Sequence, residues 1–138
     1  MRLRGAYGDG MPHLTVHVLE RDLAGREPAL IERLTDAVVA VYGEWARGLV
    51  DIRLIGLPPH RWGIGGAAAQ SPAPSITFGI KEAAFGRPDA GEIVARLVSG
   101  VTDAVVDVFG ERVRAGVTVE LVATVAGRTG IGGVVVTS

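Results

Sequence analysis

Residues 35–66 read TDAVVAVYGEWARGLVDIRLIGLPPHRWGIGG, and residues 102–133 read TDAVVDVFGERVRAGVTVELVATVAGRTGIGG. The two stretches are identical at 16 of 32 positions, which chance does not produce in so short a chain. The sequence therefore predicts two copies of one structural unit. A solenoid needs at least three repeats to cover its ends, so we expect the two copies to close on each other in one pseudo-symmetric sheet.

Hydrophobic periodicity predicts a strand, a helix and a second strand within the first copy. Residues 12–18 alternate between apolar and polar side chains, as a half-buried strand does. Residues 27–42 follow the helical period, with Pro28 near the start and Gly43 past the end. Residues 50–57 return to period two. Because a helix-length crossover joins the two strands, we expect them to run parallel.

The apolar positions assign one core face to each element. The first-copy helix presents a stripe of Leu30, Ile31, Leu34, Ala37, Val38, Val41 and Tyr42. The second copy repeats the strand, helix and strand in Ile76, Phe78 and Ile80, then Ile93, Leu97, Val101, Ala104, Val105 and Val108, then Val117, Val119 and Leu121. The predicted fold class is an α/β (α+β) two-layer sandwich: a four-stranded mixed sheet with both helices on one face.

Residues 35–66 and 102–133 are offset by 67 positions, but nearer the start of the copies Glu20 pairs with Glu82 at an offset of 62. Five extra residues therefore lie between Glu82 and Thr102. We expect them to lengthen the loop around Gly86, Arg87 and Pro88. The Gly-Ile-Gly-Gly runs at 63–66 and 130–133 predict backbone turns with positive-φ glycines, since no Gly-Lys-Ser/Thr follows them as in a phosphate loop.

Length and composition predict a single domain over residues 11–138, with repeat 1 at 11–70, repeat 2 at 71–138 and an N-terminal extension at 1–10. The 14 basic and 15 acidic residues form no run of either sign, which argues against a nucleic-acid partner. No segment has the apolar length of a membrane span or a secretory signal, and there is no cysteine, so we expect a cytoplasmic protein without thiolate zinc sites.

The predicted sheet face opposite the helices mixes polar residues, Lys81 among them, with Ile55 and Val122, which favours partial cover by other subunits. On this face Arg53 could form a structural ion pair with Glu120. His13 and His17 lie on one strand face, but no third ligand has useful spacing, so we expect a polar surface and no metal site.

Two segments resemble a known family. Residues 11–20 read MPHLTVHVLE, and residues 61–66 read RWGIGG. Proline after methionine, a short strand, a helix carrying Leu30-Ile31, a second strand containing Arg53, and an aromatic before Gly-Ile-Gly-Gly together resemble the 4-oxalocrotonate tautomerase group of the tautomerase superfamily. The resemblance covers residues 11–66 well and 74–133 more weakly. It implies a homotrimer in which each chain replaces two short subunits.

The resemblance also implies a reaction. An N-terminal proline is a secondary amine and can act as a general base, while arginines bind the carboxylate of a 2-oxo acid and stabilise a developing dienolate. By position Pro12 is the catalytic residue, and Arg53 and Trp62 bind a small-molecule carboxylate substrate. The implied function is a tautomerase that transfers a proton in a small 2-oxo or dienol acid without a cofactor. Trp62 could alternatively cover a subunit boundary.

Several positions depart from the family pattern. A further family arginine falls at Asp22, with Arg21 beside it as the candidate substrate contact. Arg87 could reach a neighbouring site or remain a solvated loop charge. In the second copy the proline is the internal Pro74, and the counterparts of Arg53 and Trp62 are Glu120 and Thr129, so we expect at most one site per chain.

Eleven residues precede Pro12, and an amide nitrogen has no basic lone pair. Either processing exposes Pro12 as the first residue, or proline chemistry is not used and Pro12 is the rigid first residue of an edge strand. In the second case His17 is an alternative base for a hydration, decarboxylation or cyclisation in a biosynthetic pathway, or the protein is a non-catalytic ligand-binding relative.

Overall fold

A computed structural model gives the fold of residues 12–137; the predicted extension at residues 1–10 lies outside this range. The first copy forms the predicted strand, helix and strand, joined by short helical segments. In chain order these are β1 (His13–Leu19), α2 (Glu20–Leu23), α3 (Glu27–Tyr42), the 3-10 helix η1 (Glu44–Leu49), β2 (Asp51–Leu57), η2 (Pro59–Arg61), β3 (Gly63–Ile64) and β4 (Ala67–Ala68). Helix α3 has the bounds that the sequence predicts.

The second copy repeats this order, except that the 3-10 helix η3 replaces α2 and no helix within the described residues corresponds to η2. Its elements are β5 (Ser75–Lys81), η3 (Glu82–Gly86), α4 (Ala90–Phe109), η4 (Glu111–Gly116), β6 (Thr118–Thr124), β7 (Gly130–Ile131) and β8 (Val134–Val135). The likeness extends to surface ion pairs. Arg47 contacts Glu44 and Asp36 over 2.6 and 2.9 Å, and Arg114 makes the corresponding contacts over 2.7 and 2.8 Å with Glu111 and Asp103. The two copies thus share these surface contacts as well as their main elements.

The four long strands form one mixed sheet in the order β2-β1-β5-β6. Strands β1 and β2 run parallel, as do β5 and β6, and the central β1 and β5 run antiparallel. The expected closure of the two copies into one sheet is confirmed. Because β1 is an interior strand, the alternative in which Pro12 begins an edge strand is wrong.

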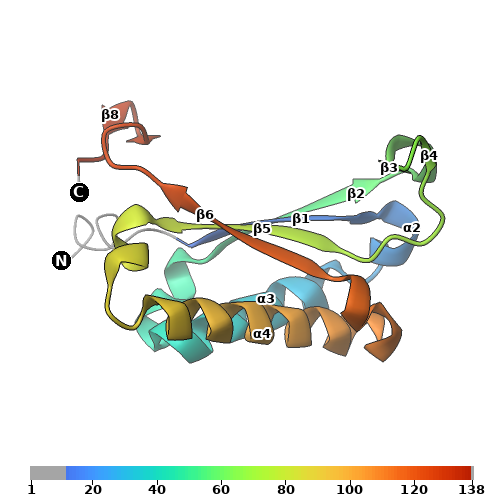
Figure 1. Ribbon diagram of the computed structural model, residues 1–138, viewed down its shortest axis with the longest axis horizontal. Coiled ribbons are helices and arrows are strands. Elements are labelled where there is room, and N and C mark those ends of the chain that lie inside the picture. Colours follow the sequence, from blue (N-terminus) through green and yellow to red (C-terminus); the bar gives the residue numbers. More distant parts are fainter. Residues whose placement is uncertain (1–11, 138) are drawn as a thin grey trace.

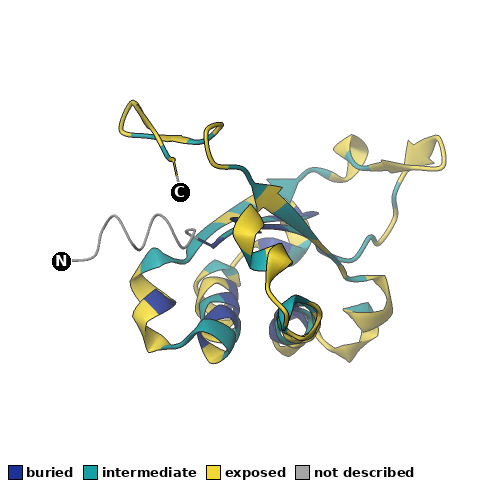
Figure 2. Cartoon of the chain, turned by 60° about the vertical axis from the view of Figure 1, so that its left-hand side comes forward, coloured by how far each residue is buried: buried dark blue, intermediate teal, exposed yellow. Residues whose placement is uncertain are grey.

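Both long helices cover one face of the sheet, as Figure 1 shows for α3 and α4. The buried residues lie between these layers. In Figure 2 they are the dark blue parts of the helices and of the sheet. Among the fully buried ones are Leu14, Val16, Leu30, Leu34, Val38, Ile76, Phe78, Leu97, Val101 and Val105. This confirms the two-layer sandwich. Ile31 was assigned to the core stripe wrongly, because its position on α3 leaves it 43% exposed.

The extra residues of the second copy lengthen a helix instead of the loop that we expected. Helix α4 has 20 residues against 16 in α3, and η3 has 5 against 4 in α2. The connecting loop at 87–89 is as short as the loop at 24–26. The added first turn of α4 contains Ile93, which packs on the core, so the insertion extends the amphipathic stripe.

Each copy ends in a short hairpin that projects from the sheet, and the two hairpins lie at opposite ends of the molecule in Figure 1. In the first, Gly65 and Gly66 have φ of 66° and 88°, and in the second Gly132 and Gly133 have φ of 61° and 81°. Two consecutive positive-φ residues make the type I′ turn that suits a two-residue hairpin. The predicted glycine turns are therefore confirmed.

Within residues 12–137, neither α3 nor α4 nor any shorter helix combines the length and apolarity needed to cross a membrane. In the same range no three His, Asp or Glu side chains lie close enough together to hold a metal ion.

Candidate functional site

Pro12 lies immediately before β1 and is buried. Its carbonyl oxygen accepts a hydrogen bond from the backbone N–H of Asp51, over 2.9 Å, which fixes it beside the start of β2. On the other side, His13 is paired with Gly79 of the antiparallel β5, so Pro12 lies next to the end of β5. Sheet pairing therefore brings residues 80 and 81 to Pro12.

A pocket of about 360 Å³ opens beside Pro12. Its wall combines the end of α3, the start of η1, the end of β5 and the segment that follows it. The lining residues are Pro12, Tyr42, Trp45, Ile80, Lys81, Ala83, Ala84 and Arg87. Most of this surface is apolar or aromatic, and Lys81 and Arg87 are the cationic side chains that residues 12–137 contribute to it. A largely apolar wall with a few convergent polar groups is typical of a small-molecule site.

The aromatic part of the wall is held in place. The indole Nε1 of Trp45 donates a hydrogen bond to the carbonyl of Tyr42 over 2.6 Å. Gly43 lies against the same ring, and a Cβ at Gly43 would be 3.0 Å from Trp45 Cδ1. Burial raises the pKa of Tyr42 above 10.0, and the positive charge of Arg87 opposes this shift more weakly. Tyr42 is therefore a neutral phenol at physiological pH.

Arg87 and Lys81 differ in their partners. Arg87 donates hydrogen bonds to both carboxylate oxygens of Asp89, over 3.0 and 3.2 Å. Among residues 12–137, no carboxylate forms an ion pair with Lys81. Lys81 is also the single lysine of the sequence. The pocket therefore holds one compensated cation and one uncompensated cation.

The structure brings Arg87 to Pro12 of its own chain but separates Pro12 from Arg21 and Trp62. Arg21 follows the far end of β1, roughly 20 Å away at about 3.3 Å per strand residue. There it donates a hydrogen bond to the carbonyl of Gln70. Trp62 precedes β3 at that same end of the sheet. A site containing all the residues that the resemblance implies is not assembled within one chain.

Arg53 is an exposed residue of β2 and donates a hydrogen bond to Asp51 over 3.0 Å. It does not line the Pro12 pocket. The considered ion pair with Glu120 is wrong, because β2 and β6 are opposite edges of the sheet. Arg53, Thr15, Thr77 and Glu120 form one cross-strand row, with about 14 Å between its ends at about 4.8 Å per strand.

His17 lies on the same outer face, five residues along β1 from Pro12. It is paired with Ile55 and Ser75 in neighbouring strands and does not line the pocket. His13 lies nearer to Pro12, and its imidazole covers Gly79, where an added Cβ would clash with the ring.

Different side chains occupy the corresponding positions of the second copy. Phe109 takes the place of Tyr42 and is only 6% exposed. Arg26 lies over the Phe109 ring, with its guanidinium carbon 5.4 Å from the ring centroid. Arg112 stands where the first copy has Trp45. The side chains that line the Pro12 pocket at positions 42 and 45 are thus not repeated in the second copy.

Sequence reasoning missed Lys81, Trp45 and Tyr42 as pocket residues. Tyr42 was assigned only to the core stripe, and Lys81 only to the mixed sheet face. One signal could have pointed to Trp45: the position is aromatic in the first copy and is Arg112 in the second, directly after the Gly-Glu pair that both copies share. Lys81 carries a similar signal as the single lysine among 14 basic residues.

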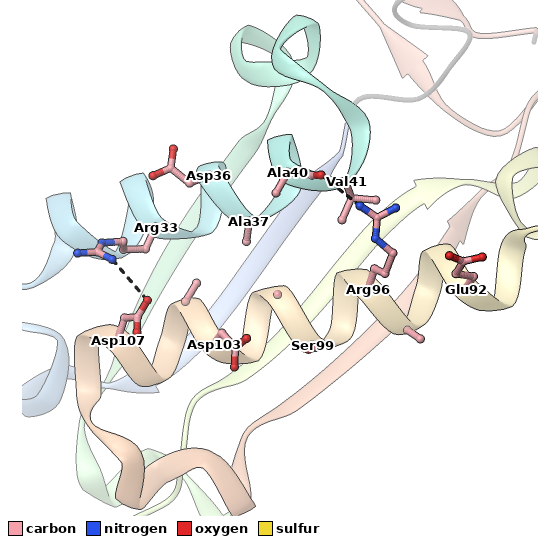
Figure 3. Close-up of a pocket in the computed structure, with 13 residues that line it drawn as sticks. Arg33, Asp36, Ala37, Ala40, Val41, Glu92, Arg96, Ser99, Asp103 and Asp107 are labelled. Carbon is pink, nitrogen blue, oxygen red and sulfur yellow. Dashed lines mark hydrogen bonds and ion pairs between the residues drawn. The ribbon is translucent and has the colours of Figure 1, made fainter.

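A second hollow, of about 600 Å³, runs between α3 and α4 and is shown in Figure 3. Small residues such as Ala37 and Gly100 line it, and charged side chains from both helices surround it. Two contacts cross it: Arg33 to Asp107 over 3.4 Å, and Arg96 to the carbonyl of Ala40 over 3.3 Å (Figure 3). These contacts tie the two helices together, as expected of a helix-packing groove.

Solved structures share this architecture. The F6 fused 4-OT wild-type asymmetric trimer is 26% identical, with a TM-score of 0.75 over 90% of this chain and 95% of that chain. A native fused 4-OT is also 26% identical, with a TM-score of 0.73 over the same shares. Pt0534 inactivated by 2-oxo-3-pentynoate, at 22% identity, has a TM-score of 0.73 over 90% and 95% and supports the fold alone. No protein-family model and no curated protein matches the sequence.

The pseudo-symmetric sheet, the two helices and the paired hairpins are those of a fused double β-α-β protein. The chain has the fused 4-OT-like fold of the tautomerase superfamily, which confirms the resemblance found in residues 11–66.

Proposed function

We propose that this protein is a cofactor-free tautomerase that transfers a proton within a small 2-oxo or dienol carboxylic acid. The observation that carries the proposal is the shared pocket of Pro12, Lys81 and Arg87. A 2-oxo acid needs a base beside its acidic carbon and a cation at its carboxylate. Once its nitrogen is a free amine, Pro12 is the base, and it returns the proton as the conjugate acid. Tyr42 and Trp45 exclude water from the other wall.

We also propose that the protein acts as a homotrimer, because the F6 and R7 fused 4-OT proteins are trimers. Both hairpins expose apolar side chains, namely Ile64 at 62%, Val134 at 69% and Val135 at 55%. Such surfaces favour cover by another copy. Arg21, Arg53 and Trp62 do not line the Pro12 pocket of their own chain, so only another copy could bring them to it, and the proposed reaction needs none of them.

The test compares the full chain with a chain that begins at Pro12 after removal of Met11. We expect the shortened chain to convert the enol of an aryl 2-oxo acid to its keto form about 100-fold or more faster, the usual effect of a positioned general base. Pro12→Ala in the shortened chain removes this gain. Circular dichroism should be used to check that both chains are folded. Equal turnover by a full chain whose N-terminus is intact by mass spectrometry would exclude Pro12 as the base.

A chemical probe tests the amine directly. The probe is 2-oxo-3-pentynoate, which inactivates Pt0534. Its ketone activates one alkyne carbon, and an amine can add to that carbon. We expect the shortened chain to gain one equivalent of the probe on the peptide that begins at Pro12. The full chain, where Pro12 is an amide, should gain none there. An adduct at His17 in place of Pro12 would support the alternative base.

A further inference from the structure

The charges around the pocket decide which acids it can hold. Arg87 is held by both oxygens of Asp89, so this pair contributes almost no net charge. Among residues 12–137, Lys81 is the other cation in the wall, and no carboxylate of that range lines the pocket. With Pro12 in its neutral, basic form, the described part of this chain leaves one uncompensated positive charge in the pocket. One such charge matches one carboxylate, while a second carboxylate would be buried without a partner.

The remaining wall determines the body of the ligand. Tyr42, Trp45, Ile80, Ala83 and Ala84 give an apolar surface. The Trp45 ring is fixed by its hydrogen bond to Tyr42, yet 56% of the residue is exposed, so a flat ligand could cover it without moving it. A preformed aromatic wall loses little conformational entropy on binding.

The pocket is also small. Its volume of about 360 Å³ lies near the lower end of the roughly 300–1,000 Å³ typical of ligand pockets. A single ring or a short conjugated chain with one acid group fits this space.

We propose that the pocket selects small monocarboxylates with a flat apolar body, aryl or conjugated, over dicarboxylates, and that Lys81 is the residue that binds the carboxylate. This inference rests on the proposed function for the location of the site and adds its specificity. Lys81 suits the role because its ammonium group is a mobile point charge next to Pro12, whereas the planar group of Arg87 is already engaged.

The test measures binding, so that it does not depend on turnover. Calorimetry compares trans-cinnamate, an unreactive aryl monocarboxylate, with trans,trans-muconate, a conjugated dicarboxylate, on the full chain and on the chain that begins at Pro12. We expect cinnamate to bind about tenfold or more tightly than muconate on both chains. Lys81→Met should weaken cinnamate binding about ten- to a hundred-fold, the usual effect of losing a charged hydrogen bond, and Lys81→Arg should restore most of it.

A second measurement locates the ligand. Because Lys81 is the single lysine, an amine-acylating reagent modifies one side chain, and peptide mapping separates it from the N-terminal amine. Saturating cinnamate should slow acylation of Lys81 several-fold, and muconate at the same concentration should not. Trp45→Ala should weaken cinnamate binding, and Trp45→Phe should preserve it.

The outcomes separate the two proposals. Tighter binding of muconate, or unchanged cinnamate binding in folded Lys81→Met, would overturn the specificity proposal even if the shortened chain is an active tautomerase. Cinnamate binding through Lys81 with no turnover by the shortened chain would support the specificity proposal and contradict the proposed reaction.

Discussion

Arg87 binds both carboxylate oxygens of Asp89, over 3.0 and 3.2 Å, and so lines the Pro12 pocket as a neutral pair. If this pairing limits the pocket to monoanions, removing the charge of Asp89 should change the specificity. We expect Asp89→Asn to leave Arg87 as a second uncompensated cation and to tighten muconate binding about tenfold, with a smaller change for cinnamate, measured by calorimetry.

The control for this variant is Asp107→Asn. It makes the same chemical change in the Arg33–Asp107 pair, which lies in the groove between the two long helices. Its ligand affinities should equal those of the unchanged chain. Asp89 caps α4 without a side-chain hydrogen bond, so asparagine can replace it there with little effect on folding. An Asp89→Asn protein with unaltered muconate affinity would show that the pair does not limit specificity.

Burial of Tyr42 predicts a pH dependence of stability. The pKa of Tyr42 is raised above 10.0 in the folded chain, so the folded state holds its proton more tightly than the unfolded state does. The resulting stabilisation is fully present below pH 10 and is lost as the pH rises through the folded-state pKa. We expect the free energy of unfolding to fall more between pH 9 and 11 in the unchanged chain than in Tyr42→Phe, measured by urea unfolding. Parallel curves would contradict this prediction.

The exposed apolar hairpins predict where the assembly can be broken. Val134→Lys and Ile64→Lys each put a charge on a side chain that we expect to be covered by another copy. Light scattering coupled to gel filtration should show a trimer for the unchanged chain and smaller species for both variants. Thr137→Lys adds the same charge at an exposed polar position after β8 and should remain trimeric. A monomeric unchanged chain at micromolar concentration would refute the trimer.

Two glycines, one inside α4 and one just after it, allow the effect of side-chain space to be distinguished from the effect of backbone conformation. An added Cβ meets nothing within 4 Å at either Gly91 or Gly110, but Gly110 has φ of 100° and ψ of 158°. We expect Gly110→Ala to lower the free energy of unfolding by about 1–3 kcal/mol, because this region is nearly exclusive to glycine. Gly91→Ala, inside α4, should raise it by about 0.5 kcal/mol. Chemical denaturation measures both, and equal effects of the two variants would contradict the argument.

Some relationships between strands could not be predicted from the sequence. Periodicity identified each strand but did not give the order of the strands in the sheet. As a result the sequence allowed Pro12 on an edge strand and Arg53 beside Glu120, and both expectations failed once β1 proved interior and β2 and β6 proved to be opposite edges. Alternation reports which face a residue occupies, not which strand lies next to it.

The sequence by itself determined the two-unit architecture. Two-residue and helical periods are local properties, so they identified four strands and two helices, and the repeat required these to close into one sheet. The sequence also marked Pro12 and Arg87 as candidates, through a family resemblance and a position in the second copy.

Only the tertiary structure decided what surrounds Pro12. The antiparallel pairing of β1 with β5 places the end of one copy's first strand beside the start of the other's, and thereby joins Lys81 and Arg87 to Pro12. The end of α3 adds Tyr42, and η1 adds Trp45. These contacts lie as many as 75 residues apart in the chain, from 12 to 87, and arise from long-range pairing that no local pattern encodes.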